Sequence, residues 1–130
     1  MIDVTAAILI HDGKVLIARR KPGGKLPDQW EFPGGKLEAG ETARECLRRE
    51  MREEFGIEIR PDEFLGESVY HYPHGSIKLL AYRATWLEGN LVLIDHADYA
   101  WVKCSQLHEY DFTPADLPFV RKLISGQIKI

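Results

Sequence analysis

The segment from Glu41 to Gly56 constrains this chain most, because it combines strong helix signals with a charge pattern that a helix does not favour. Thr42 and Glu45 have the spacing of a capping box, and Gly56 stands where a glycine commonly ends a helix. These signals predict a helix that runs from the residue after Thr42 to Phe55. At 100° per residue, four apolar side chains form one stripe along it, namely Ala43, Leu47, Met51 and Phe55. This helix therefore has to pack against a core.

Three carboxylates crowd the edge of that apolar stripe. Nine of the fourteen residues at positions 41–54 are charged, and Glu50, Glu53 and Glu54 lie beside the stripe or project onto it. Like charges four residues apart destabilise a helix, and the last helical turns favour cations over anions. A solvated charged face with Arg–Glu pairs explains the arginines but leaves the clustered acids unexplained. Carboxylate oxygens are the ligands that hard divalent cations prefer, so the segment indicates a metal site.

The composition excludes several classes of protein. With 130 residues, of which 45% are hydrophobic and 28% charged, the chain is expected to form one soluble globular domain over residues 1–130. No apolar run reaches the ~20 residues of a membrane span, and the first residues lack the basic start of a secretory signal. Two cysteines make neither a disulfide framework nor a complete zinc site, so a reducing cytoplasm is expected. The net charge of −3 disfavours binding to duplex nucleic acid.

Turn residues divide the rest of the chain into short apolar segments. Asp12-Gly13 predicts a hairpin between the first two strands, and Thr113-Pro114 begins a terminal helix that ends near Ser125-Gly126. Strands are predicted at residues 4–10, 15–18, 30–32, 57–59, 64–72, 77–86 and 99–103. A mixed sheet with one helix at mid-chain and another at the end predicts an α/β or α+β sandwich.

The spacing of the charged segment matches a known motif. Counted along the chain, the pattern reads Gly35, five residues, Glu41, seven residues, then Arg49-Glu50-Met51-x-Glu53-Glu54-x-Gly56-Ile57. Every defining position of the Nudix box is filled, and the chance of such a match at one given position is on the order of 10⁻⁹. Similarity to the MutT-type nucleoside triphosphate pyrophosphohydrolases extends outside the box, to Arg19-Arg20, to residues 31–36 and to residues 114–116. The chain thus resembles the Nudix hydrolase family.

This resemblance implies a fold and a reaction. The implied fold is an α/β/α sandwich with a mixed β-sheet, in which the box forms a loop–helix–loop catalytic motif. The implied reaction is hydrolysis of a nucleoside diphosphate linked to a further group, with Mg²⁺ as cofactor and Mn²⁺ as a substitute. Hydrolysis of a phosphoanhydride requires cations on the phosphate oxygens and a deprotonated water held in line, which agrees with a cluster of carboxylates.

The resemblance also assigns roles to residues of the motif. The implied metal ligands are three helix carboxylates and one backbone carbonyl, those of Glu50, Glu53, Glu54 and Gly34. Glu50 is alternatively a metal-linked base, and Arg49 is implied to orient these carboxylates, a role that its planar guanidinium suits. Gly35, Glu41 and Gly56 are implied to be structural, with a peripheral metal contact as the alternative for Glu41.

Asp95 is a further candidate outside the box. It falls where MutT-type proteins have a glutamate that acts as a metal ligand or general base. The aspartate side chain is shorter, which reduces its reach, and a loop-capping aspartate is the alternative. The histidines lack metal-ligand spacing and are assigned no role, namely His11, His74, His96 and His108.

Four residues are implied to bind substrate, namely Arg20, Phe32, Lys36 and Asp116. Arg20 matches an arginine that contacts phosphate or sugar, and Lys36 is placed to face the leaving phosphates, although each is alternatively a solvated charge. Asp116 occupies the position of an asparagine that reads the base in oxidised-guanine enzymes. Since an ionised aspartate only accepts hydrogen bonds, it suits an amino or imino N–H of the base. A first-turn acid of the terminal helix is the alternative.

These observations favour conversion of a nucleoside triphosphate to the monophosphate and pyrophosphate. The favoured substrate is 8-oxo-dGTP, which would place the chain in nucleotide-pool sanitation and DNA repair. CTP or 5-methyl-dCTP is the second candidate, followed by ADP-ribose or another nucleoside diphosphate derivative. A catalytically silent binding module is disfavoured because such modules lose box carboxylates, and all are present here. Both a monomer and a homodimer remain open.

Overall fold

The computed structural model describes residues 1–130 as a sheet with helices on both faces. The strands are β1 (Ile2–His11), β2 (Lys14–Arg19), β3 (Trp30–Glu31), β4 (Glu58–Tyr72), β5 (Gly75–Glu88) and β6 (Asp98–Val102). The α-helices are α1 (Ala43–Phe55) and α2 (Leu117–Ile124), and the 3₁₀ helices are η1 (Cys104–Glu109) and η2 (Pro114–Asp116). Neither α1 nor α2 is long and apolar enough to cross a membrane.

The sheet is mixed, as predicted. Its strand order is β3-β2-β1-β5-β4, with β6 paired to β2. β1 and β5 are parallel, whereas the other pairs are antiparallel. The predicted hairpin forms at Asp12-Gly13, where both residues have positive φ angles of 50° and 73°. β1 and β2 pair next to this turn, at Ile10–Val15 and His11–Lys14. Further along, β2 pairs with β3 and β6.

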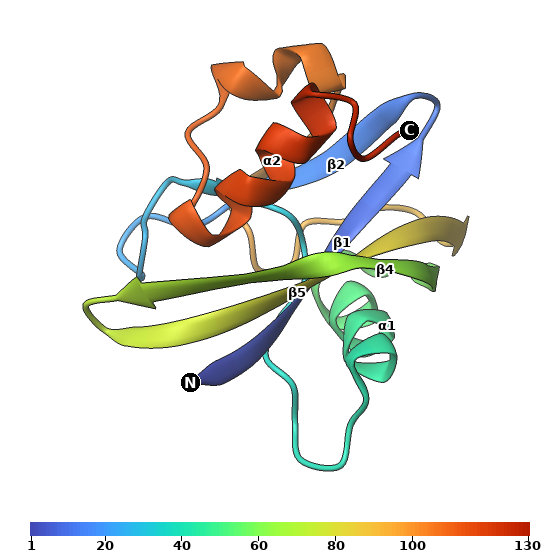
Figure 1. The fold of residues 1–130 in the computed structure, drawn as a ribbon. Helices are drawn as coiled ribbons and strands as arrows, with labels where there is room; N and C mark the ends of the chain where they lie inside the picture. The colour runs from blue at the N-terminus through green and yellow to red at the C-terminus, as the bar shows by residue number, and fades with distance from the viewer.

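Each face of the sheet is covered by one helix (Figure 1). Ala6 and Ile8 of β1 belong to the core cluster that contains α2, and the alternate residues Ala7 and Leu9 belong to the cluster that contains α1. Burial on both faces explains why β1 is a continuous apolar run rather than an alternating one. The layers are those of an α/β/α sandwich, which confirms the predicted fold class.

Most strand bounds differ from the predicted ones by one or two residues, and two elements differ more. The predicted strands at 57–59 and 64–72 form one strand, β4, whose register shifts between Pro61 and Phe64. β4 lies at the edge of the sheet, where a proline and a bulge interrupt the alternation without ending the pairing. The terminal helix also begins later than predicted, because Pro114–Asp116 form a 3₁₀ turn before α2 starts at Leu117.

Candidate active site

The two caps of α1 fix the position of the acidic segment. The Thr42 hydroxyl accepts a hydrogen bond from the Glu45 amide at 3.1 Å, and the Glu45 carboxylate accepts one from the Thr42 amide at 2.9 Å. Gly56 ends the helix with a φ of 68°, a left-handed conformation that favours glycine. Three residues of the predicted stripe are fully buried, namely Leu47, Met51 and Phe55. The caps and the stripe confirm the predicted helix and set which face of α1 meets the sheet.

Arg49 connects the acids of α1 to the loop that precedes the helix. Its Nε lies 2.6 Å from Glu41 Oε2, and its Nη1 lies 2.9 Å from Glu50 Oε1 and 3.1 Å from Glu53 Oε2. Its Nη2 also donates to the Lys36 carbonyl at 3.1 Å. The hydrogen bonds from Arg49 lower the pKa of Glu41 to about 2. One guanidinium therefore orients three carboxylates at once, a geometry that only a planar fork of donors provides.

The loop before α1 packs so closely that two positions exclude a side chain. A Cβ on Gly34 would lie 1.9 Å from the Thr5 carbonyl oxygen, and a Cβ on Gly35 would lie 2.3 Å from the Glu50 carboxyl carbon. Thr5 and Ala7 of β1 donate to the Gly35 and Pro33 carbonyls at 2.8 and 2.7 Å. No protein donor reaches the Gly34 carbonyl between them. This carbonyl is therefore available to a ligand beside the Glu50 carboxylate.

Glu54 is the acid whose environment most clearly calls for a cation. Its Oε2 atom is buried and has no hydrogen-bond partner. Burial raises the pKa of Glu54 to about 9, and the nearby charge of Glu50 adds to the increase. A buried carboxylate oxygen without a partner is unfavourable unless a positive charge or a donor reaches it. Two acidic side chains beside a free carbonyl make a set of hard oxygen donors that fits a divalent cation.

The predicted metal ligands are not all gathered at one point. Glu53 is 59% exposed and is bound to Arg49, and it does not line the cavity described below. Asp95 lies at the cavity rim, where its side chain is 72% exposed and 3.8 Å from Lys21 Nζ. No three acidic, histidine or cysteine side chains form a compact metal-binding group in the structure. Glu50, Glu54 and the Gly34 backbone are the ligand candidates that the fold brings together.

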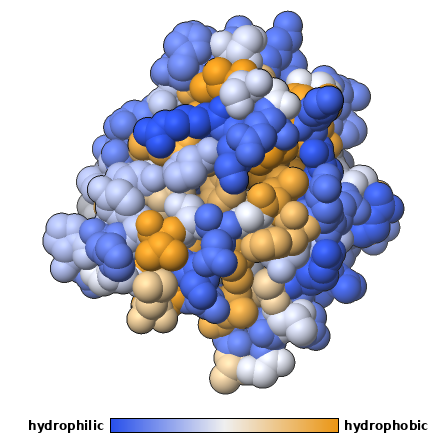
Figure 2. Space-filling view, viewed as in Figure 1, coloured by the Kyte–Doolittle hydropathy of each residue, from blue (hydrophilic) through white to orange (hydrophobic).

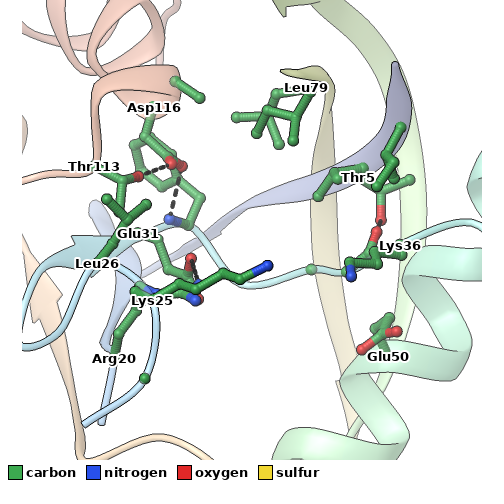
Figure 3. Close-up of a pocket in the computed structure, with 18 of the residues that line it drawn as sticks. Thr5, Arg20, Lys25, Leu26, Glu31, Lys36, Glu50, Leu79, Thr113 and Asp116 are labelled. Carbon is green, nitrogen blue, oxygen red and sulfur yellow. Dashed lines mark hydrogen bonds and ion pairs between the residues drawn. The ribbon is translucent and has the colours of Figure 1, made fainter. Parts of the chain in front are cut away.

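A cavity of about 580 Å³ extends from these acids to the start of α2. Asp116 and Thr113 lie at one end, Glu50 of α1 lies at the other, and the Lys25 side chain extends between them (Figure 3). One face of the molecule shows apolar surface near its middle with hydrophilic residues around it (Figure 2). Apolar side chains also line the cavity, among them Val4, Ile77 and Leu79. Four cationic side chains also line the cavity, namely Arg20, Lys21, Lys25 and Lys36. The cavity thus combines an acidic end, cations and apolar walls.

Asp116 is the polar group at the far end of the cavity. It is 5% exposed, and its Oδ1 accepts a hydrogen bond from the Phe32 amide at 3.1 Å. Its Oδ2 accepts one from the Thr113 hydroxyl. Burial raises the pKa of Asp116 to about 7, and the charge of Glu31 adds to the increase. Because a carboxylate has about four acceptor positions, these two bonds leave capacity for donors of a ligand.

Arg20 and Phe32 both line this cavity, and each also has a partner within the protein. Arg20 lines the cavity, and its Nη1 forms an ion pair of 2.9 Å with Glu31 Oε1. The ring of Phe32 is buried against Phe112, with ring centroids 5.5 Å apart. All four predicted substrate-binding residues therefore border the same cavity, including Lys36 and Asp116.

Glu31 and His96 also belong to the site, and no role was predicted for either. His96 is 8% exposed, and its Nε2 lies 2.9 Å from Glu31 Oε2. Its Nδ1 lies 3.7 Å from Glu54 Oε2. A charged residue within the short apolar strand around Trp30 was the available signal for Glu31. No sequence spacing connects His96 to its partners, because the contact with Glu31 spans 65 residues.

The fold and the acidic cavity define a class of protein. The family model of the NUDIX domain matches residues 1–123, so the chain belongs to the NUDIX family and is a Nudix hydrolase. Enzymes of this family generally use a divalent metal ion, which agrees with the oxygen donors of Glu50, Glu54 and Gly34.

Individual relatives are similar over nearly the whole chain. The CTP pyrophosphohydrolase of Escherichia coli is 34% identical over 125 residues, which cover 96% of this chain and 93% of the relative. The 8-oxo-dGTP diphosphatase of the same species is 30% identical over 113 residues, covering 87% and 88%. The solution structure of the E. coli ORF135 protein has a TM-score of 0.86 at 34% identity, covering 98% of this chain and 91% of that one.

Proposed function

We propose that this enzyme hydrolyses a nucleoside triphosphate to the monophosphate and pyrophosphate, with 8-oxo-dGTP as the preferred substrate. The observation that carries this proposal is the arrangement of the cavity, with the buried acceptor Asp116 at one end and the acids of α1 at the other. A nucleotide has the matching polarity, because its base carries N–H donors and its phosphates associate with cations. The similarity to the E. coli 8-oxo-dGTP diphosphatase supports this choice of base.

The proposed cofactor is Mg²⁺, with Mn²⁺ as a substitute. Its proposed ligands are Gly34, Glu50 and Glu54, which line the cavity together. Glu53 and Asp95 are proposed as further ligands, although their side chains are 59% and 72% exposed. When bound, the cation neutralises charge on the phosphate oxygens and lowers the pKa of a water molecule. Arg49 holds Glu50 and Glu53 in place through its Nη1 atom.

The remaining side chains are proposed to position the substrate and to move a proton. Arg20 binds a phosphate or the sugar, Lys36 binds phosphate oxygens, and Phe32 and Asp116 bind the base. One carboxylate among three candidates accepts the proton of the attacking water, namely that of Glu50, Glu53 or Asp95. Gly35, Glu41 and Gly56 are proposed to be structural, since each shapes the backbone or an ion pair around α1.

A second candidate substrate is CTP or 5-methyl-dCTP. The 34% identity to the E. coli CTP pyrophosphohydrolase over 96% of the chain favours it. The amino group at cytosine N4 is also a donor that an aspartate accepts. The same end of the cavity is therefore proposed to bind either a purine or a pyrimidine base.

The biological setting is proposed from the same chemistry. We propose that residues 1–130 act as a single hydrolase domain in the cytoplasm, as a monomer or homodimer, with a role in nucleotide-pool sanitation and DNA repair. The two cysteines are free, which supports a reducing compartment. The proposed partner is the nucleotide alone, without duplex nucleic acid or membrane.

A substrate panel tests the proposed function. Purified protein with Mg²⁺ is assayed for pyrophosphate release from 8-oxo-dGTP, dGTP, CTP, 5-methyl-dCTP and dATP, and for AMP release from ADP-ribose. We expect kcat/KM to be at least about tenfold higher for 8-oxo-dGTP than for dGTP. A higher value for a cytosine nucleotide would establish the second candidate instead. Equal and very poor turnover of every triphosphate would contradict both.

A further inference from the structure

His96 lies at a fixed place between the two ends of the cavity. It belongs to the segment between β5 and β6, which is bonded to α1 where the Ile94 amide donates to the Glu54 carbonyl at 3.4 Å. Beyond the histidine, the Ala97 amide donates to the Arg19 carbonyl at 2.9 Å. The His96 ring stacks on Phe55, with ring centroids 5.3 Å apart and an interplanar angle of 19°. The backbone hydrogen bonds of Ile94 and Ala97 and the buried ring of Phe55 therefore determine the position of the imidazole.

One edge of the imidazole contacts the substrate-binding side of the cavity. The Nε2 atom lies 2.9 Å from Glu31 Oε2, while Glu31 Oε1 is paired with Arg20 Nη1 at 2.9 Å. Because an ionised carboxylate only accepts hydrogen bonds, Nε2 carries the proton and donates to Glu31. Glu31 is thereby held by one donor on each oxygen, and it in turn fixes the Arg20 guanidinium.

The other edge of the imidazole faces the acidic end. The Nδ1 atom lies 3.7 Å from Glu54 Oε2, and neither atom has a hydrogen-bond partner although both are buried. Buried polar atoms without partners are uncommon, and here two of them face each other. The unpaired Oε2 atom of Glu54 is thus bordered by the edge of the imidazole.

We infer that His96 is a positioning residue that fixes Glu54 at the metal end and the Glu31–Arg20 pair at the nucleotide end of one cavity. This inference rests on the proposed function, since it assumes a cation at Glu54 and a nucleotide beside Arg20. His96 is only 8% exposed, and we infer that it acts through the carboxylates on its two edges. Removal of a side chain that orients a metal ligand typically lowers metal affinity 10- to 100-fold.

Two substitutions separate the edges of the ring. His96→Phe keeps a ring against Phe55 and removes both nitrogens, whereas His96→Gln keeps an N–H donor in reach of Glu31 and removes the edge that faces Glu54. His108→Gln is the control, because His108 is exposed on η1. Far-UV circular dichroism and Tm are measured first for each variant, to show that it is folded.

The first measurement is Mn²⁺ binding to the free protein, followed by electron paramagnetic resonance. We expect the Kd for Mn²⁺ to rise at least about tenfold in both His96 variants and to stay unchanged in His108→Gln. The second measurement is KM for the best triphosphate of the panel. We expect KM to rise several-fold in His96→Phe and to stay within about twofold of the wild type in His96→Gln, because only the glutamine donates to Glu31.

Each result bears on the inference. If a folded His96→Gln variant binds Mn²⁺ as tightly as the wild type, His96 does not position Glu54 for the metal. This result counts whether or not His96→Phe folds. Equal KM values in the wild type and His96→Phe would show that His96 does not position the Glu31–Arg20 pair for the substrate. Mn²⁺ binding can be measured without turnover. If the wild type hydrolyses no triphosphate, the proposed function is contradicted, but the Mn²⁺ measurements still test the role of His96 beside Glu54.

Discussion

At the scale of single residues, the charged side chains of the site differ in whether they have a hydrogen-bond or ion-pair partner. Arg49 Nη1 is shared by Glu50 and Glu53, which lie 2.9 and 3.1 Å away. Glu54, one residue further, has a buried oxygen without a partner. Of the three acids on this face of α1, the arginine therefore pairs with Glu50 and Glu53 and leaves Glu54 for a ligand. A charge count of the segment does not reveal this unequal distribution.

Glu53→Gln tests whether that exposed acid belongs to the metal site. The substitution removes a negative charge and a strong oxygen donor while it preserves size, so kcat with Mg²⁺ is expected to fall by about two orders of magnitude or more. Tm is expected to change little, since the side chain is 59% exposed. The matched control is Glu109→Gln, at an exposed position on η1. Near-normal kcat in the Glu53 variant would remove Glu53 from the ligand set.

Asp116→Asn tests how the base is read. An amide presents a donor and an acceptor where the carboxylate presents acceptors only, so the order of preference among bases is expected to change. Loss of a base contact typically changes discrimination by about 1–3 kcal/mol, which is a change of roughly 5- to 150-fold in the ratio of kcat/KM values. The substrate panel measures this ratio for the variant and the wild type. An unchanged ranking would count against a role in base recognition.

At the scale of elements, local signals explain α1 and long-range packing explains the rest. The capping box and the C-terminal glycine lie within the sequence of α1, which is why both ends of this helix were predictable. The late start of α2 was not, because Asp116 is tied to the Phe32 amide, 84 residues away. β4 was predicted as two strands, since the continuity of an edge strand across Pro61 depends on its partner β5. His96 and Glu31 were missed for the same reason.

The glycine pair before α1 gives a prediction about one loop. Gly34→Ala is expected to destabilise the protein by about 1–3 kcal/mol or more, because the new Cβ would meet the Thr5 backbone. Gly35→Ala is expected to cost less stability and more activity, because its Cβ would displace the Glu50 side chain instead. Urea unfolding and kcat are measured for both. Gly24→Ala is the matched control, since nothing lies within 4 Å of that position; equal stability of all three variants would refute the predicted clash.

At the scale of the whole molecule, the buried Asp116 links stability to pH. Its pKa is raised to about 7 from an ordinary value of 3.8, so the folded protein binds a proton that the unfolded chain has released. The free energy of unfolding is therefore expected to decrease as pH rises from about 4 to about 7. The decrease attributable to this group amounts to at most about 4 kcal/mol. Below pH 4 both states are protonated and the contribution is fully present.

Comparison with Asp116→Asn isolates that contribution. Urea unfolding of the wild type and the variant is measured from pH 4 to pH 8. As pH rises, the free energy of unfolding of the wild type is expected to fall relative to that of the variant. Asp3→Asn, at an exposed position in β1, is the control and is expected to follow the wild type. A pH-independent difference between wild type and Asp116→Asn would show that Asp116 does not titrate in this range.

The bonds from Thr5 and Ala7 to the glycine loop also have a dynamic consequence. These amides belong to the central strand β1, yet their acceptors are the Gly35 and Pro33 carbonyls of the loop. Their protons can exchange with solvent deuterium only when the loop leaves the strand. If loop and strand open together, Thr5 and Ala7 exchange as slowly as the most protected amides of the sheet. The loop at the acidic end would then be as rigid as the core, and substrates would meet a surface that is already formed.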